Sequence, residues 1–125
     1  MAAIKHIEFW VLDIEKSMNF YGRLFKIIGW EPVGENGFKA GDTKIYFKES
    51  KDGAMQRSLG PRHICFQADS RAIVDEVGRC LGAENSRVIR GPVEIEGEKY
   101  SEGYYTVDFY DPDGYILEVA HSPNV

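Results

Sequence analysis

Two parts of the chain have nearly the same sequence. Residues 6–9 are His-Ile-Glu-Phe, and residues 63–66 are His-Ile-Cys-Phe. Each run continues into a short apolar stretch, an aspartate (Asp13 or Asp69) and a helical pattern. A repeat of this length predicts two copies of one supersecondary unit, neither of which buries its hydrophobic face alone. Packing would require the isoleucines and phenylalanines of the repeat but not its histidines. The repeat therefore predicts a metal or catalytic site that contains His6 and His63.

The length of the chain limits how these two copies are arranged. A chain of 125 residues is long enough for one domain with a hydrophobic core, but not for two independent ones. We therefore expect a single domain over 1–125. Its predicted parts are a first module at about 4–50, a linker at 51–61 and a second module at about 62–123.

Composition excludes several classes of partner. The chain has 15 basic and 20 acidic residues, and its Lys and Arg residues form no stripe, so we expect no nucleic-acid partner. Its apolar runs are too short to span a membrane, and its N-terminus lacks the apolar segment of a signal peptide. We therefore expect a cytoplasmic protein without a membrane partner. In that compartment Cys65 and Cys80 are expected to be free, buried thiols.

Alternation of apolar and polar residues predicts the strands. In residues 5–11, Phe9 and its apolar neighbours face one side, whereas His6, Glu8 and Trp10 face the other. The same alternation recurs in four further segments: 43–49, 63–68, 104–110 and 115–121.

Helical patterns follow the first strand of each half. Asp13 is the predicted N-cap of a helix that ends at Gly29, and either Asp69 or Ser70 caps a second helix that ends at Gly82. Each half is thus predicted to be β-α-β-β-β. The predicted fold class is α+β, with two tandem β-α-β-β-β modules that form a curved mixed sheet cup lined by the polar strand faces.

The polar faces carry His6, His63 and Glu118, each on a different predicted strand. Two imidazoles and one carboxylate make a facial set of ligands for a divalent transition metal, with open positions for substrate or water. The alternative interpretation is that both histidines are hydrogen-bonded structural residues and that the glutamate is solvated.

The chain resembles the vicinal oxygen chelate superfamily, which includes glyoxalase I, extradiol dioxygenases, fosfomycin-resistance transferases and bleomycin-resistance proteins. The resemblance covers essentially the whole chain. It rests on His6, the run Ser17-Met18-Asn19-Phe20-Tyr21, His63, and the most specific part, Asp111-Pro112-Asp113-Gly114-Tyr115-Ile116-Leu117-Glu118. It implies paired modules around a metal, with His6, His63 and Glu118 as ligands. Fe, Mn, Ni, Co and Zn all suit such ligands.

One position departs from glyoxalase I. That enzyme has a fourth ligand, a glutamate on the last strand of the first module, where this chain has Tyr46. A neutral phenol, with an ordinary pKa of about 10, is a poor metal ligand and a poor base. Glu49 is nearby but falls on the opposite face by alternation. Glyoxalase I activity is therefore disfavoured, and Tyr46 is kept as a lesser catalytic candidate.

Other residues of the polar faces are candidates for catalysis or substrate binding. Glu8 and Asp108 are each a candidate general base or a partner that orients a ligand imidazole. The alternative is that both are hydrogen-bonded to neighbouring Tyr, Lys or Arg side chains. His121 is expected to lie outside the site, and Trp10 fits an interface as well as a pocket. The predicted substrate pocket is lined by Trp10, Gln67, Tyr104, Thr106 and Tyr110.

The function predicted first is a metal-dependent enzyme of the lyase, isomerase or dioxygenase type that acts on a small oxygen-bearing substrate. The second is a protein that sequesters a small molecule, such as an antibiotic, without catalysis. A fosfomycin-type thiol transferase ranks third, because residues 92–103 carry Glu94, Glu96, Glu98 and Glu102, a poor surface for an anionic phosphonate. Sheet edges left open by two modules predict a homodimer.

Overall fold

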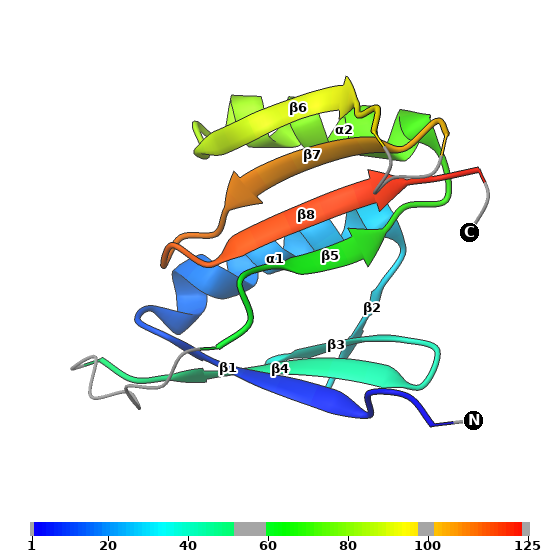
Figure 1. Ribbon diagram of the computed structural model, residues 1–125. Coiled ribbons are helices and arrows are strands. Elements are labelled where there is room, and N and C mark those ends of the chain that lie inside the picture. Colours follow the sequence, from blue (N-terminus) through cyan, green and yellow to red (C-terminus); the bar gives the residue numbers. More distant parts are fainter. Residues whose placement is uncertain (1, 52–59, 98–101, 124–125) are drawn as a thin grey trace. The chain divides into compact units, whose positions relative to one another are not determined.

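The structure is a computed structural model that describes residues 2–51, 60–97 and 102–123. It forms two compact units, Met1–Leu59 and Gly60–Val125. Each unit has the predicted β-α-β-β-β order, which confirms the α+β fold class (Figure 1). The elements are β1 (His6–Val11), α1 (Ile14–Ile28), β2 (Glu31–Val33), β3 (Gly37–Ala40), β4 (Thr43–Glu49), β5 (Ile64–Gln67), α2 (Arg71–Ala83), β6 (Val88–Glu94), β7 (Tyr105–Tyr110) and β8 (Ile116–His121).

The structure does not test the predicted linker or the predicted single-domain organisation in full. Residues 52–59, which make up most of the expected linker, lie outside the described residues. The single-domain organisation stays a prediction. None of the described helices has the length and apolar character needed to cross a membrane.

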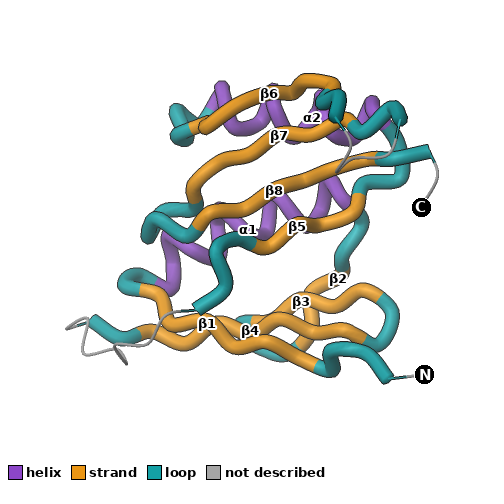
Figure 2. The backbone as a smooth tube through the Cα atoms, viewed as in Figure 1, coloured by secondary structure: helices purple, strands orange, loops and turns teal. Residues whose placement is uncertain are grey.

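The first unit is a sheet of four strands in the order β1-β4-β3-β2 (Figure 2). The sheet is mixed, because β1 is parallel to β4 whereas β3 is antiparallel to both of its neighbours. Aromatic rings fill the space between this sheet and α1. Tyr21 and Phe25 of the helix are fully buried, and their ring centroids lie 4.3 Å from Phe47 and 4.7 Å from Phe38, respectively. These packed rings require the apolar strand residues to face the helix, which leaves the polar residues of β1 on the opposite face.

Both ends of α1 are the predicted ones. The Asp13 side chain accepts a hydrogen bond from the backbone N–H of Lys16 at 3.1 Å, and Gly29 ends the helix in the left-handed conformation. Glu49 adds a second cap, because its Oε1 accepts from the backbone N–H of Ile14 at 3.1 Å. The Glu49 side chain therefore lies on the sheet face that packs against the helix, as the alternation of residues 43–49 predicts.

The second unit is a four-stranded mixed sheet in the order β5-β8-β7-β6, with β5 parallel to β8. The helix α2 packs against β6, β7 and β8 and covers one face of this sheet (Figure 1). The core between them is fully buried and aliphatic or aromatic: Val74, Val77, Val107, Phe109, Leu117 and Val119. The other face carries the polar residues and is where the candidate site lies.

The end of α2 differs from the prediction. Ser70 is the N-cap, one of the two predicted residues, but the helix continues through Gly82 to Ala83. Asn85 takes the left-handed conformation with φ +55°. Its N–H donates to the Gly82 carbonyl and that of Ser86 donates to the Leu81 carbonyl, the pattern of a Schellman motif. The prediction that Gly82 ends the helix is therefore wrong, since an asparagine supplies the left-handed residue.

Both cysteines are free, as predicted, but the expectation that they are buried is wrong. Cys65 is exposed and Cys80 is partly exposed. Cys65 follows the strand alternation, because its neighbour Phe66 occupies the buried face of β5. The Cys65 thiol thus lies on the same face as the candidate site.

Replacing Gly91 with alanine is expected to lower the free energy of unfolding by about 2 kcal/mol or more. Gly91 has φ +89°, and an added Cβ would lie 2.3 Å from the backbone oxygen of Thr106 on the neighbouring strand. Urea unfolding of Gly91→Ala measures the effect.

The matched control is Gly22→Ala. Gly22 lies within α1, and an added Cβ would meet nothing within 4 Å. This variant is expected to be more stable than the wild type by about 0.5–1 kcal/mol. Equal stability of Gly91→Ala and the wild type would contradict the close approach of β6 and β7 at Gly91.

Candidate functional site

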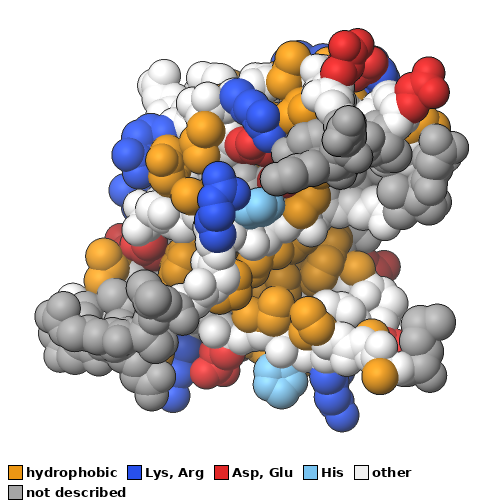
Figure 3. Space-filling view, in the orientation of Figure 1, with side chains coloured by type: hydrophobic (Ala, Val, Ile, Leu, Met, Phe, Trp, Pro, Cys, Tyr) orange, Lys and Arg blue, Asp and Glu red, His pale blue; other side chains and the backbone are white. Residues whose placement is uncertain are grey.

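The polar face of the second unit gathers a histidine and charged side chains of both signs (Figure 3). At its centre is Glu118 of β8, which is only 6% exposed. Glu118 lies opposite Cys65 on β5 and opposite Asp108 on β7 in the strand register. Burial of a carboxylate is costly unless donors surround it. The groups that contact the Glu118 carboxylate therefore define the candidate site.

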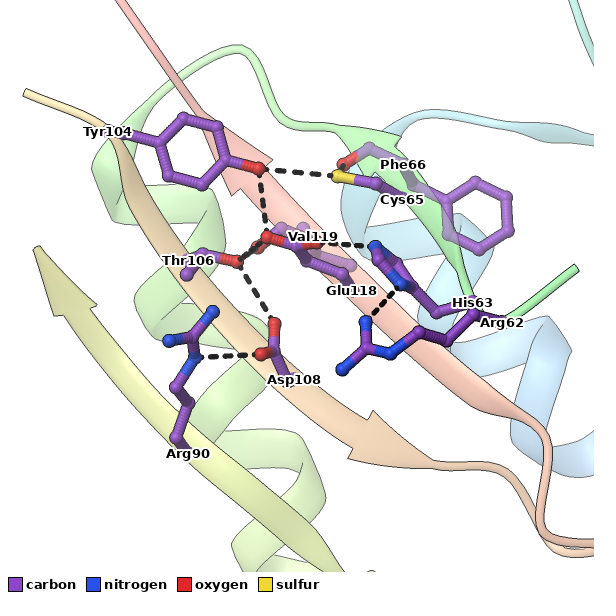
Figure 4. A network of polar contacts seen from close by, with 10 residues as sticks. All are labelled: Arg62, His63, Cys65, Phe66, Arg90, Tyr104, Thr106, Asp108, Glu118 and Val119. Atoms are coloured by element: carbon purple, nitrogen blue, oxygen red, sulfur yellow. Dashed lines mark hydrogen bonds and ion pairs between the residues drawn. The ribbon is translucent and has the colours of Figure 1, made fainter. Parts of the chain in front are cut away.

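Both oxygens of Glu118 have donors (Figure 4). Oε2 accepts from the hydroxyl of Tyr104 at 2.8 Å and from that of Thr106 at 2.7 Å. Oε1 lies 3.1 Å from Nε2 of His63. His63 precedes β5 directly, Tyr104 precedes β7, and Thr106 is a fully buried residue of β7. Two segments that are far apart in the sequence, one before β5 and one at the start of β7, thus hold one carboxylate.

Asp108 is also held by neighbours on the same face. Its Oδ2 accepts from Nε of Arg90 at 2.8 Å, and its Oδ1 lies 3.4 Å from the Thr106 hydroxyl. This is the hydrogen-bonded arrangement that the alternative interpretation of Asp108 describes. A role as general base stays a prediction for Asp108.

Two neutral groups border the carboxylate. Burial raises the pKa of Tyr104 above its ordinary value, and its hydrogen bond to Glu118 raises it further. Burial, followed by the charge of Glu118, raises the pKa of Cys65 to about 12, although solvent reaches part of the side chain. The Cys65 sulfur lies 3.8 Å from the Tyr104 hydroxyl. Both groups therefore stay protonated at neutral pH, and Tyr104 acts as a donor.

Other predicted residues of the second unit are exposed or contact other groups. Gln67 is exposed on β5. The Arg87 guanidinium lies 4.2 Å from the centre of the Tyr110 ring. Nδ1 of His121 lies 3.0 Å from the carbonyl oxygen of Ala68, and the exclusion of His121 from the site stays a prediction.

The acidic segment at 92–103 is only partly described. Glu94 forms an ion pair with Arg71 of α2, so its charge is matched. Glu98 lies outside the described residues. With the charge of Glu94 matched by Arg71, this segment repels an anionic phosphonate less strongly than the sequence alone indicates.

In the first unit, His6, Glu8 and Trp10 are exposed on one face of β1. Glu8 pairs in register with Tyr46, whose ring centroid lies 6.0 Å from that of His6 in an edge-on arrangement. Tyr46 lies over Gly37, where an added Cβ would be 2.6 Å from the ring. These predicted residues therefore share one sheet face within their unit.

His63 and Glu118 fit two ligands of one divalent ion. Nitrogen and oxygen ligands of zinc lie about 2.0–2.2 Å from the metal, so adjacent ligand atoms are roughly 3 Å apart. The distance of 3.1 Å between Nε2 and Oε1 matches that spacing. Tyr104 and Thr106 supply the outer hydrogen bonds that ligating carboxylates commonly have. Within the described ranges no three His, Cys, Asp or Glu side chains form a metal-binding group, and His6 as third ligand stays a prediction.

Sequence reasoning missed Cys65 and Arg62. Alternation in 63–68 places Cys65 on the polar face and was a usable signal. Arg62, whose Nη1 lies 2.9 Å from Nδ1 of His63, carries no such signal because it precedes the strand.

Replacing Thr106 with valine is expected to lower the free energy of unfolding by about 1–3 kcal/mol, since the buried Glu118 carboxylate loses its shortest hydrogen bond. Thr106→Ser keeps the hydroxyl and is the matched control. Urea unfolding of both variants measures the difference. A valine variant as stable as the serine variant would show that this hydrogen bond does not support Glu118.

Comparison with known proteins places these features in a family. The model of the "Glyoxalase/Bleomycin resistance protein/Dioxygenase superfamily" matches residues 3–119. The uncharacterized protein YqjT of Bacillus subtilis (strain 168) is 27% identical over 92% of this chain and 95% of its own length.

Solved structures show the same fold. A Bacillus halodurans protein is 24% identical, with 95% of each chain covered and a TM-score of 0.76. A glyoxalase/dioxygenase from Nostoc punctiforme is 20% identical, with 97% of this chain and 91% of that chain covered and a TM-score of 0.75. At these identities the likeness concerns the fold alone.

Proposed function

The chain belongs to the glyoxalase/bleomycin resistance protein/dioxygenase superfamily, and we propose that it is a metal-dependent enzyme of that superfamily acting on a small oxygen-bearing substrate. The superfamily includes metal-dependent enzymes and often uses divalent metals. The finer assignment to a lyase, isomerase or dioxygenase type is part of this proposal, as is the expected homodimer.

One observation supports the proposal most. The imidazole of His63 and the carboxylate of Glu118 converge at 3.1 Å on the polar sheet face. Glu118 is buried at the cost of desolvation, and the second unit supplies two hydroxyl donors for its other oxygen. A solvated surface glutamate, the alternative interpretation, would need neither the burial nor these donors.

The residues of the site have distinct proposed roles. His63 and Glu118 would hold the ion together with His6, while Tyr104 and Thr106 fix the direction of the Glu118 carboxylate. A bound divalent ion would act as a Lewis acid toward oxygen atoms of the substrate. Asp108 forms an ion pair with Arg90 and lies beside Glu118 on the polar sheet face.

Metal-free protein without a polyhistidine tag is expected to bind at least one of Mn, Co, Ni, Zn or, under anaerobic conditions, ferrous iron. His63→Ala and Glu118→Gln are each expected to weaken binding by more than about tenfold, the least that loss of an outer hydrogen-bond partner costs a metal site. Titration calorimetry measures the dissociation constants.

The matched control is His121→Ala, which removes an imidazole of the same unit that contacts the Ala68 carbonyl. It is expected to bind metal like the wild type. A wild-type protein that binds none of these metals would contradict the proposal. Tight small-molecule binding that resists both chelator and His63→Ala would support sequestration instead.

Replacing Tyr46 with glutamate is expected to tighten metal binding by at least about tenfold, because a carboxylate replaces a neutral phenol beside His6. Tyr46→Phe is the control and is expected to leave the dissociation constant within about twofold of the wild type. Titration of the metal-free variants measures both. An unchanged constant in the glutamate variant would show that position 46 does not face the metal.

A further inference from the structure

The contact between Arg62 and His63 determines which nitrogen of the imidazole carries hydrogen. Nη1 of Arg62 lies 2.9 Å from Nδ1 of His63 (Figure 4). A guanidinium has only donors and stays charged at any ordinary pH. Nδ1 must therefore be the acceptor and cannot carry a hydrogen.

The other nitrogen of the ring has the opposite role. In a neutral imidazole with a bare Nδ1, the hydrogen is on Nε2. Nε2 lies 3.1 Å from Oε1 of Glu118, which accepts a hydrogen bond. The two contacts of His63 are consistent with each other, and both select the same tautomer.

This tautomer conflicts with metal binding through Nε2. A ligating nitrogen needs its lone pair, so the hydrogen must be on Nδ1, where ligand histidines usually donate to a carboxylate or carbonyl. A guanidinium cannot accept that hydrogen bond. Arg62 in its observed position therefore opposes a metal at the nitrogen that faces Glu118.

We propose that Arg62 is a positioning residue that keeps His63 in its non-ligating tautomer, so that metal binding requires the guanidinium to leave Nδ1. The inference rests on the proposed function. One hydrogen leaves Nε2 and one joins Nδ1 during the exchange, so the imidazole stays neutral. Arg62 is exposed, so solvent reaches its side chain.

The metal affinity of Arg62→Gln tests the proposal. Glutamine removes the obligatory donor and offers a carbonyl oxygen that accepts from Nδ1–H. The dissociation constant of the most tightly bound metal is expected to fall by about fivefold, the effect of one hydrogen bond of ordinary strength. An unchanged constant in Arg62→Gln would overturn the proposal.

Loss of a positive charge alone also favours cations, and Arg87→Gln controls for it. The Arg87 guanidinium lies over the Tyr110 ring of the same unit. Repeating both titrations at high salt screens exposed charges. The gain in Arg62→Gln is expected to persist there and to exceed that in Arg87→Gln. Equal gains in the two variants would assign the effect to charge and overturn the proposal.

NMR of the imidazole nitrogens in metal-free protein gives a readout that needs no metal. At a pH where the ring is neutral, the wild type is expected to carry hydrogen on Nε2, with a bare, hydrogen-bonded Nδ1. The Nδ1 signal is expected to move in Arg62→Gln and not in Arg87→Gln. Hydrogen on Nδ1 of the wild type would overturn the proposal.

The two experiments fail in different ways. A wild type that binds no metal overturns the proposed function and the effect of Arg62 on affinity, while the NMR result still decides whether Arg62 selects the tautomer. A wild type that binds metal through His63, with no change in Arg62→Gln, overturns the role of Arg62 and leaves the proposed function intact.

Discussion

A carboxylate buried in a sheet face must be surrounded by donors, and the second unit is organised around that requirement at Glu118. Tyr104 and Thr106 bond one oxygen, and His63 lies at the other. The donors come from segments that the strand pairing of β5, β8 and β7 brings together. The buried Glu118 carboxylate therefore has its hydrogen-bond donors only when the strands pair in this order. The proposed metal site in turn requires that these donors fix the direction of the carboxylate.

The same division of sheet faces governs both units. In the first unit the rings of Tyr21, Phe25 and Phe47 require one face of the sheet to pack against α1. In the second unit apolar residues, among them Phe109, do the same against α2. Hydrophobic burial therefore determines which strand residues face the helix, and the polar residues are left on the other face as a consequence. The candidate functional residues therefore lie on the sheet face that does not pack against the helix.

Much of this was predictable because strand alternation is a strong local signal. Alternation placed His6 with Glu8, and Glu118 with Thr106 and Asp108, on polar faces. Capping chemistry predicted both ends of α1. These features depend on residues close in sequence, so a single chain is enough to reveal them.

The remaining features depend on tertiary contacts or loop geometry. Tyr104 was predicted as a pocket residue, but its reach to Glu118 depends on the path of the chain into β7. The guanidinium of Arg62 bonds the adjacent His63 only because of the loop that enters β5. The end of α2 depends on Asn85 in a conformation for which glycine is the usual residue. The periodicity of apolar and polar residues carries no information about these contacts and loop conformations.

Crystals of the protein grown with zinc or nickel, measured at the absorption edge of the metal, would locate a bound ion relative to His63 and Glu118. We expect an anomalous peak within about 2.0–2.2 Å of both Nε2 of His63 and Oε1 of Glu118. His63 is expected to keep its place beside Glu118, with the Arg62 guanidinium displaced from Nδ1. A bound metal located away from these two atoms would show that His63 and Glu118 do not form the metal site.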